Sequence, residues 1–230
     1  MKKKSKRYKK IKENLKTKKI DGLNQVIKEI KNNSNAKFTE SIDVSFKINL
    51  KKTKEADSTI RNLIELPHGN GKKIKIAVLC DENKVDTAKK AGADIAGSED
   101  LIKKISDKKI DFDKLICTPS MMPKIAKLGK ILGPKGLMPN PKLGTVTDNL
   151  NKTIDIIKNK SVEVRNDKDG NLAMSIGRKT FDEKKISENL KTVFQSLKKE
   201  KPTLFNSVNI KKVFLSSTMG PSFKLNFKDI

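Results

Sequence analysis

The sequence predicts a mixed α+β and α/β protein with two domains, and three observations support this fold class. Segments near both ends of the chain alternate apolar and polar residues, as strands with one solvent-facing side do. The middle of the chain alternates short apolar strands with short helices, which is typical of a small parallel sheet. Of the 230 residues, 35% are hydrophobic, which is enough for one or two modest cores.

The chain begins with a strongly basic segment. Residues 1–20 contain eleven lysine or arginine side chains and one acidic residue, Glu13. Like charges at this density repel one another, so an isolated ordered helix is not expected here. The segment is either a solvated tail or an arm that becomes ordered on a phosphate backbone.

A helix and two strands are predicted next. Apolar residues at helical spacing predict a helix over 21–32, with one face formed by Leu23, Val26, Ile27 and Ile30. Strict alternation predicts a strand over 36–50, and its apolar side chains are Phe38, Ile42, Val44, Phe46, Ile48 and Leu50. A second, shorter strand is predicted over 59–67.

The middle of the chain changes pattern and predicts strands and helices in turn. Apolar runs predict strands over 73–80, 93–97 and 113–119, and helices are predicted over 85–93, 98–108 and 122–132. Ser98 is the expected N-cap of the second helix, because acidic residues follow it in the first turn. The third helix carries Ile125, Leu128 and Leu132 on one side and is expected to end at Gly133.

The first pattern returns from residue 161 onward. Two strands are predicted within 161–177, joined by a turn at Asp169–Gly170. An amphipathic helix is predicted over 182–200, with Ile186, Leu190, Val193, Phe194 and Leu197 facing inward. The chain then ends in strand material over 208–227, broken at Gly220–Pro221.

Both ends of the chain therefore look alike, and the middle differs from them. The economical architecture is a split α+β domain made of residues 1–67 and 160–230, with an inserted three-layer Rossmann-like α/β domain at residues 68–159. Two adjacent crossings between domains form a natural hinge. The expected hinge residues are Pro67, His68, Gly69, Asn159 and Lys160.

Charge and composition narrow the classes of function. The formal net charge is +25 at pH 7, and a field of that sign attracts polyanions. Nucleic acid is the first candidate and an anionic membrane surface the second. No run of eighteen apolar residues predicts a membrane span, and no apolar run follows the basic N-terminus as a secretory signal would require.

Catalytic and metal chemistry is not expected. The chain has two cysteines, Cys80 and Cys117, and one histidine, His68, which excludes an ordinary Cys/His zinc site within one chain. The cysteines are expected to be buried free thiols rather than a disulfide or redox pair. Neither the Walker spacing nor a glycine-rich turn after the first parallel strand is present, so no nucleotide cofactor is expected. No catalytic constellation is recognisable.

The stretch "GKILGPKGLMPNPKLGT", residues 129–145, has no helical or strand period. A flexible linker is a poor interpretation, because prolines stiffen the segment and a linker would leave its apolar side chains exposed to solvent. Two interpretations stay open. Lys130, Lys135 and Lys142 can grip a phosphate backbone beside exposed glycine N–H groups, or the loop only covers the α/β core.

The chain resembles the large-subunit ribosomal protein family called L-one, bacterial type. The resemblance rests on "GKILGPKGLMPNPKLGTVT" and on "AKFTESIDV", "LPHGNGK", "AGAD", "FDKLICTP", "VEVRNDKDGN" and "STMGPS", which follow the family's order along almost the whole chain. It implies a two-domain fold with a split first domain, and a cytoplasmic protein of the large ribosomal subunit.

The resemblance also implies partners. These are large-subunit rRNA in the mobile stalk, deacylated tRNA leaving the exit site, and the leader of the protein's own mRNA, which bacterial members repress. No cofactor, metal, membrane or enzymatic activity is implied, and the free protein is expected to be a monomer. A free-standing RNA-binding translational regulator is the alternative, because one surface could bind either RNA.

By resemblance, the rRNA surface lies on the split domain. The expected contact residues are Lys37, Phe38, Glu40, Arg165, Asp167, Lys168, Thr218, Met219 and Gly220. Structured RNA is recognised mainly through its shape, 2′-hydroxyls and backbone. Lys37 would pair with a phosphate, and Phe38 either offers an apolar face to a sugar or base or is the first core residue of its strand. Thr218 would bond a 2′-hydroxyl, while Met219 would pack on sugars.

Overall fold

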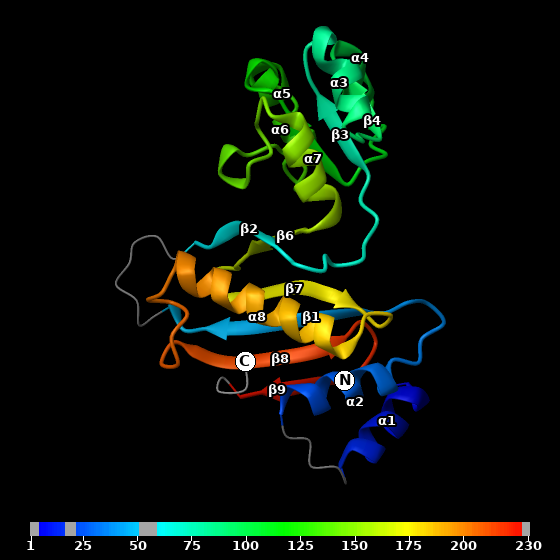
Figure 1. Ribbon diagram of the computed structural model, residues 1–230, viewed down its shortest axis with the longest axis vertical. Coiled ribbons are helices and arrows are strands. Elements are labelled where there is room, and N and C mark those ends of the chain that lie inside the picture. Colours follow the sequence, from blue (N-terminus) through cyan, green and yellow to red (C-terminus); the bar gives the residue numbers. More distant parts are fainter. Residues whose placement is uncertain (1–4, 17–21, 51–58, 227–230) are drawn as a thin grey trace. The chain divides into compact units, whose positions relative to one another are not determined.

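The computed structural model describes residues 5–16, 22–50 and 59–226 (Figure 1). The chain divides into two compact units, one formed by residues up to Gly71 together with residues from Val162 onward, and the other by Lys72–Ser161. We call them the split unit and the inserted unit and describe each by itself. Whether each folds as an independent domain with the limits given above stays a prediction.

The split unit is built on a four-stranded antiparallel sheet in the order β7-β1-β8-β9. The strands are β1 (Ser41–Ile48), β7 (Asn171–Arg178), β8 (Ile210–Ser217) and β9 (Ser222–Leu225). In the central strand, Val44 is paired with Met174 on one side and Leu215 on the other. Burial alternates along β1, as the period of two in the sequence predicts.

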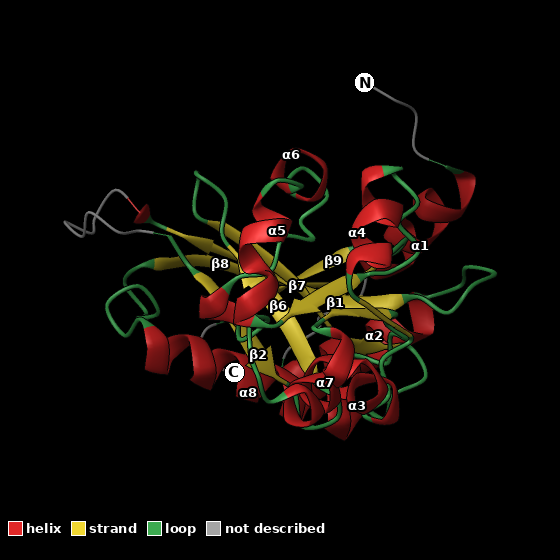
Figure 2. Ribbon diagram, turned by 90° about the horizontal axis from the view of Figure 1, so that it is seen from above, coloured by secondary structure: helices red, strands yellow, loops and turns green. Residues whose placement is uncertain are grey.

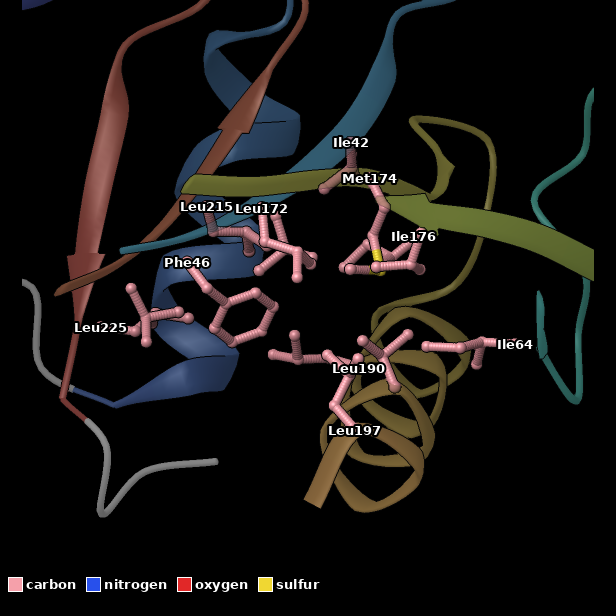
Figure 3. Close-up of a cluster of buried hydrophobic side chains, with 14 of the residues drawn as sticks. Ile42, Phe46, Ile64, Leu172, Met174, Ile176, Leu190, Leu197, Leu215 and Leu225 are labelled. Carbon is pink, nitrogen blue, oxygen red and sulfur yellow. The ribbon is translucent and has the colours of Figure 1, made fainter. Parts of the chain in front are cut away.

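Two helices, α2 (Leu23–Asn33) and α8 (Glu183–Glu200), pack on one face of this sheet (Figures 1 and 2). Their apolar faces meet the inward side chains of the strands in one continuous core (Figure 3). Ile27, Leu190 and Phe46 are among the members with 1% exposure or less. Burying each such side chain contributes about 1.5–3 kcal/mol, so this core dominates the stability of the unit.

A small second sheet completes the split unit. It pairs β2 (Arg61–Glu65) with β6 (Ser161–Arg165). Ile64 and Val164 join the same core. The predicted turn at Asp169–Gly170 is present, but the strands on either side of it belong to different sheets, because β7 takes β1 as its main partner and touches the end of β6 only through the bridge Asn166–Leu172.

Gly170 is required where it stands. Its φ of 77° lies in the left-handed region, and a Cβ there would come within 2.5 Å of the carbonyl oxygen of Ile48. The close approach lets the Gly170 carbonyl accept a bond from the Ile48 N–H at 2.8 Å, which fixes this turn against the end of β1.

Two expectations for the N-terminal part were wrong. The basic segment contains a helix, α1 (Lys6–Lys16), because tertiary contacts compensate for the repulsion between its charges: Ile11 is buried, and the Arg7 guanidinium donates to the carbonyl of Met219 at 2.6 Å. In addition, β1 begins at Ser41 rather than at residue 36. Phe38 therefore lies before the strand with 54% of its surface exposed, and it is not a core residue.

The inserted unit has a parallel three-stranded sheet in the order β4-β3-β5. The strands are β3 (Ile76–Leu79), β4 (Ile95–Gly97) and β5 (Lys114–Cys117). Every residue of β3 is buried, which means that both faces of the sheet are covered. The helices are α3 (Val85–Lys90), α4 (Glu99–Ser106), α5 (Met122–Ala126), α6 (Gly129–Leu132) and α7 (Leu150–Asn159).

Several details of this unit differ from the prediction. The single helix expected over 122–132 is interrupted between α5 and α6, although Ile125, Leu128 and Leu132 are all buried as expected. Helix α7 was not predicted, yet its sequence carries a signal, because Leu150, Ile154 and Ile157 recur at helical spacing and are buried. Ser98 precedes α4 as expected, but its side chain makes no capping hydrogen bond.

Cys80 and Cys117 are buried free thiols, as predicted. Burial raises the pKa of the Cys117 thiol to about 11, and burial is also the main cause that raises the pKa of Cys80. Across the described residues, the structure contains no helix whose length and hydropathy would allow it to span a bilayer.

Candidate RNA interface

The loop after β8 and the start of β1 are joined by hydrogen bonds between Thr218 and Ser41. The N–H of Thr218 donates to the carbonyl of Ser41 at 3.1 Å, and the N–H of Ser41 donates to the Thr218 hydroxyl at 3.1 Å. We call the joined segments, residues 36–41 and 217–220, the turn surface. Six of the residues predicted from the resemblance lie on it: Lys37, Phe38, Glu40, Thr218, Met219 and Gly220.

Glu40 is the buried centre of the turn surface, with 0% of its area exposed. One carboxylate oxygen accepts from the N–H of Met219 at 3.0 Å, and the other accepts from the N–H of Ala36 at 3.0 Å. A carboxylate that accepts two backbone N–H groups fixes both segments relative to each other. The buried Glu40 carboxylate therefore links the two segments of the turn surface.

The surroundings of Glu40 keep it ionised. Burial by itself raises the pKa of the carboxyl group. The N–H groups of Met219 and Ala36, the hydroxyl of Ser217 and the positive charge of Arg7 outweigh burial, and together they lower the pKa below its ordinary value. The turn surface is thus built around a negative charge that is stabilised by two backbone N–H groups, a hydroxyl group and the Arg7 guanidinium.

Arg7 is a residue of this site that the sequence analysis did not find. One guanidinium nitrogen donates to the Met219 carbonyl, while its charge acts on Glu40. Both backbone polar groups of Met219 are therefore bonded, its N–H to the Glu40 carboxylate and its carbonyl to the Arg7 guanidinium. The available signal was that Arg7 is the one arginine in residues 1–20, and arginine suits fixed, directional pairing better than lysine does.

Two large apolar side chains project from this rigid base. Phe38 is 54% exposed and Met219 is 52% exposed. Lys37 lies beside Phe38 and is also exposed. Gly220 follows Met219, and a Cβ at that position would overlap the Ser217 hydroxyl, so packing within the turn already requires glycine there.

The second predicted cluster consists of Arg165, the last residue of β6, and of Asp167 and Lys168 in the loop between β6 and β7. The Asp167 carboxylate accepts from the N–H of Asn171 at 2.6 Å, from its side-chain amide at 2.7 Å and from the N–H of Asp169 at 3.0 Å. These bonds, led by the Asn171 side chain, lower the pKa of Asp167. Asp167 therefore shapes the loop, while Arg165 and Lys168 are exposed beside it.

The structure separates the two clusters instead of bringing them together. The turn surface is at the Ser41 end of β1, whereas Asn171 is paired with Lys47 near the other end, where the Lys47 ammonium donates to the carbonyl of Asp169 at 3.1 Å. The six residue steps from Ser41 to Lys47 span about 20 Å of extended chain. A partner that touches both clusters must therefore be at least that long.

The loop over residues 129–145 is ordered and packs on its own unit. Leu132 and Leu143 are buried, and Leu137 and Met138 pack against the apolar cluster of the inserted unit. The Asn140 side chain caps the short 3₁₀ turn Pro141–Leu143 by accepting from the N–H of Lys142. The rejection of a flexible linker is thus confirmed. The predicted lysines, Lys130, Lys135 and Lys142, are all exposed, and their role toward phosphate stays a prediction.

The predicted hinge residues on the first crossing are anchored within the split unit. The buried side chain of Asn189 in α8 accepts from the N–H of His68 at 3.2 Å and donates to the carbonyls of Gly69 at 2.9 Å and Ile176 at 2.8 Å. The His68 imidazole also forms a hydrogen bond with the carboxylate of Glu188. A hinge role for Pro67, His68, Gly69, Asn159 and Lys160 stays a prediction.

Within the described part of the chain, no three His, Cys, Asp or Glu side chains lie close enough together to hold a metal ion. The turn surface combines a hydrogen-bonded turn with exposed apolar side chains, on a chain whose net charge is +25. These features are typical of the class of proteins that bind structured polyanions.

Comparison with known proteins gives the family. A profile described as the "Ribosomal protein L1p/L10e family" matches residues 27–221. The chain is 46% identical over 222 residues to the "Large ribosomal subunit protein uL1" of Pelagibacter ubique, covering 96% of each chain. It is 43% identical over 230 residues to the "Large ribosomal subunit protein uL1c" of Porphyra purpurea, covering 100% of each.

The chain therefore belongs to the ribosomal protein L1p/L10e family. Membership places it among structural proteins of the ribosome and not among enzymes.

Proposed function

We propose that this protein is a structural constituent of the large ribosomal subunit and that the turn surface of the split unit anchors it to large-subunit rRNA. Its relatives are named as proteins of the large ribosomal subunit, and the match to them covers nearly the whole chain. The net charge of +25 supports a polyanionic partner.

The observation that carries the proposal is the Glu40-centred turn. A pre-formed turn reduces the ordering cost of binding, because its backbone is already fixed by Glu40 and Arg7. It presents the apolar side chains of Phe38 and Met219 next to the ammonium of Lys37. Apolar contact with sugars or bases, combined with one phosphate contact, is the chemistry by which proteins recognise folded RNA.

The finer function follows from this anchor. Bound through the split unit, the protein forms the mobile stalk, and its inserted unit acts near the exit site, where it helps deacylated tRNA to leave. Exposed Lys130, Lys135 and Lys142 are the candidates for secondary RNA contacts from that unit. The same turn surface would recognise a similar fold in the leader of the protein's own mRNA and repress its translation.

Sedimentation with isolated large subunits that lack the protein tests the proposal, with a titration of protein-free large-subunit rRNA alongside. The parent and Lys191→Ala should co-sediment equally, because Lys191 is an exposed lysine of α8 that belongs to neither predicted contact cluster. Lys37→Ala should bind more weakly. Failure of the parent to co-sediment, together with undiminished binding to mRNA leaders, would favour the free-standing regulator.

A further inference from the structure

We propose that the outer face of the four-stranded sheet is a further contact area for the bound RNA, in which Phe214 stacks on an unpaired base and neighbouring lysines pair with phosphates. The outer face is formed by the strand side chains that point away from α2 and α8. This inference rests on the proposed function only in taking RNA as the partner.

The strand register places the residues of this face in rows across the sheet. One row runs Ala173, Ser45, Phe214 and Lys224, because each is paired with the next. The row beside it runs Asn171, Lys47 and Lys212. All seven side chains are exposed or partly exposed, in contrast to the buried residues that alternate with them.

Phe214 differs from the other phenylalanines of the sheet. Phe46 is a fully buried core residue, and Phe223 packs against the same core. Phe214 alternates with the core residues Val213 and Leu215 along β8, so its ring lies on the opposite side of the strand. A partly exposed aromatic ring on a sheet among polar neighbours is the arrangement on which single-stranded nucleic acids stack.

The face is hollowed on both sides of Ser45 and Asn171. One hollow is lined by Ser45, Phe46, Lys47, Asn171, Lys211, Lys212 and Phe214. The other is lined by Ser45, Arg165, Asn166, Asp167, Lys168, Asn171, Leu172 and Ala173. The shared residues make the two hollows neighbours, so the predicted Arg165–Lys168 cluster continues directly into the hollow that contains Phe214.

The charge of the side chains around the two hollows favours a negatively charged partner. The lysines of the first hollow and Lys224 are positive, and Arg165 and Lys168 add to them in the second hollow. The acidic side chains nearby are Asp43 on β1 and Asp167 and Asp169 in the loop, and Asp167 is engaged by Asn171 and by the N–H of Asp169. The excess of positive charge around an aromatic ring complements an RNA strand, whose phosphates are negative and whose bases are flat.

The position of the face explains why the two predicted clusters lie apart. The turn surface and the Arg165–Lys168 loop are at opposite ends of β1, separated by about 20 Å of strand. The outer face lies between the turn surface and the Arg165–Lys168 cluster. An RNA segment that contacts both ends crosses Ser45 and Phe214, so the two clusters and the face form one continuous track.

A tryptophan probe tests this directly, because the chain contains no tryptophan. In Phe214→Trp the single indole reports on the outer face, and in Val208→Trp it reports on an exposed position outside the two hollows. Titration with protein-free large-subunit rRNA should quench the fluorescence of Phe214→Trp, since a stacked base quenches indole emission. The emission of Val208→Trp should change little.

Affinity measurements with the whole chain supply the second arm. Phe214→Ala should bind the rRNA roughly 5- to 150-fold more weakly, the range that one lost stacking contact gives. Phe214→Tyr should bind like the parent, because its ring can still stack. Lys212→Ala should lower the slope of log affinity against log salt by about one unit, whereas Phe214→Ala should leave that slope unchanged.

The outcomes separate the two proposals. If the parent does not bind large-subunit rRNA more tightly than an unrelated RNA, the proposed function fails. If the parent binds but Phe214→Trp is not quenched and Phe214→Ala binds normally, the proposed function stands and the outer face is not an RNA contact. Phe214→Leu, which retains an apolar side chain on β8, shows whether a loss of binding comes from the ring or from a damaged fold.

Discussion

Replacing Glu40 with glutamine removes the charge at the centre of the turn surface and leaves the shape of the side chain almost unchanged. The carboxylate accepts from the N–H groups of Met219 and Ala36, one on each oxygen. A glutamine has one acceptor oxygen and an NH₂ group, so one of the two N–H groups must face another donor. Leaving a buried donor unpaired costs about 1–3 kcal/mol.

That cost predicts a measurable opening of the turn. Because each 1.4 kcal/mol is a factor of ten, Glu40→Gln should speed amide hydrogen exchange at Met219 or Ala36 by roughly 5- to 150-fold. Glu65→Gln is the matched control, since Glu65 is an exposed residue at the end of β2, and its change should be within about 0.5 kcal/mol. If both amides in Glu40→Gln exchange as slowly as in the parent, Glu40 does not organise the turn.

The same residue gives the turn a defined dependence on pH. The pKa of Glu40 is lowered in the folded protein, so its ionised form contributes stability at every pH above the ordinary glutamate pKa of about 4.3. That contribution is lost as the pH falls through the lowered pKa. Protection of the Met219 amide, corrected for the intrinsic rate, should hold from about pH 5 to 8 and decline below about 4. The Glu40→Gln variant should lack this decline.

Three further predictions concern charge, contact and thiol chemistry. Affinity for large-subunit rRNA should fall steeply as salt rises, and Lys37→Ala should flatten the slope by about one unit; an affinity independent of salt contradicts the electrostatic account. Met219→Ala should lower the affinity for rRNA roughly tenfold and leave the salt slope and the melting temperature unchanged, because Met219 is half exposed. Thr218→Ala should lower the affinity and also loosen the turn, because the Thr218 hydroxyl accepts from the Ser41 N–H. Thr218→Ser should restore both the affinity and the stability of the turn. Burial raises the pKa of Cys117 to about 11, so about one Cys117 thiol in a thousand is ionised at pH 8. Because both cysteines are buried, neither Cys80 nor Cys117 should react with a disulfide reagent until the chain is unfolded. Rapid labelling of the folded protein would refute this.

Periodicity in the sequence predicted the elements that have one apolar face. Helices α2 and α8 and the alternation in β1 follow the apolar spacing, because each buries a single face against the same core. Pairing between strands could not be obtained in this way. The partner of β6 is β2, about a hundred residues earlier in the chain, and no local pattern records that choice.

The sequence proposed a set of candidate contact residues, and it did not reveal the contacts that hold the turn surface together. Glu40 was expected to be a contact, whereas the structure shows a buried carboxylate whose partner Met219 is 179 residues away. Arg7 was missed because it is 212 residues from Met219 and is one of eleven basic residues in a segment without an apolar pattern. Both roles depend on contacts that exist only after the two ends of the chain have met.

Photo-crosslinking to rRNA tests the central claim, that the turn surface is what binds. Phe38, Met219 and Val208 are the exposed large apolar side chains among residues 5–16, 22–50 and 59–226, with 54%, 52% and 68% of their surfaces accessible. A benzophenone side chain would replace each in turn in the whole protein, followed by irradiation with protein-free large-subunit rRNA. Positions 38 and 219 should crosslink to the RNA efficiently, and position 208 should not, despite its greater exposure. Equal crosslinking at all three positions, or crosslinking at position 208 alone, would contradict the account.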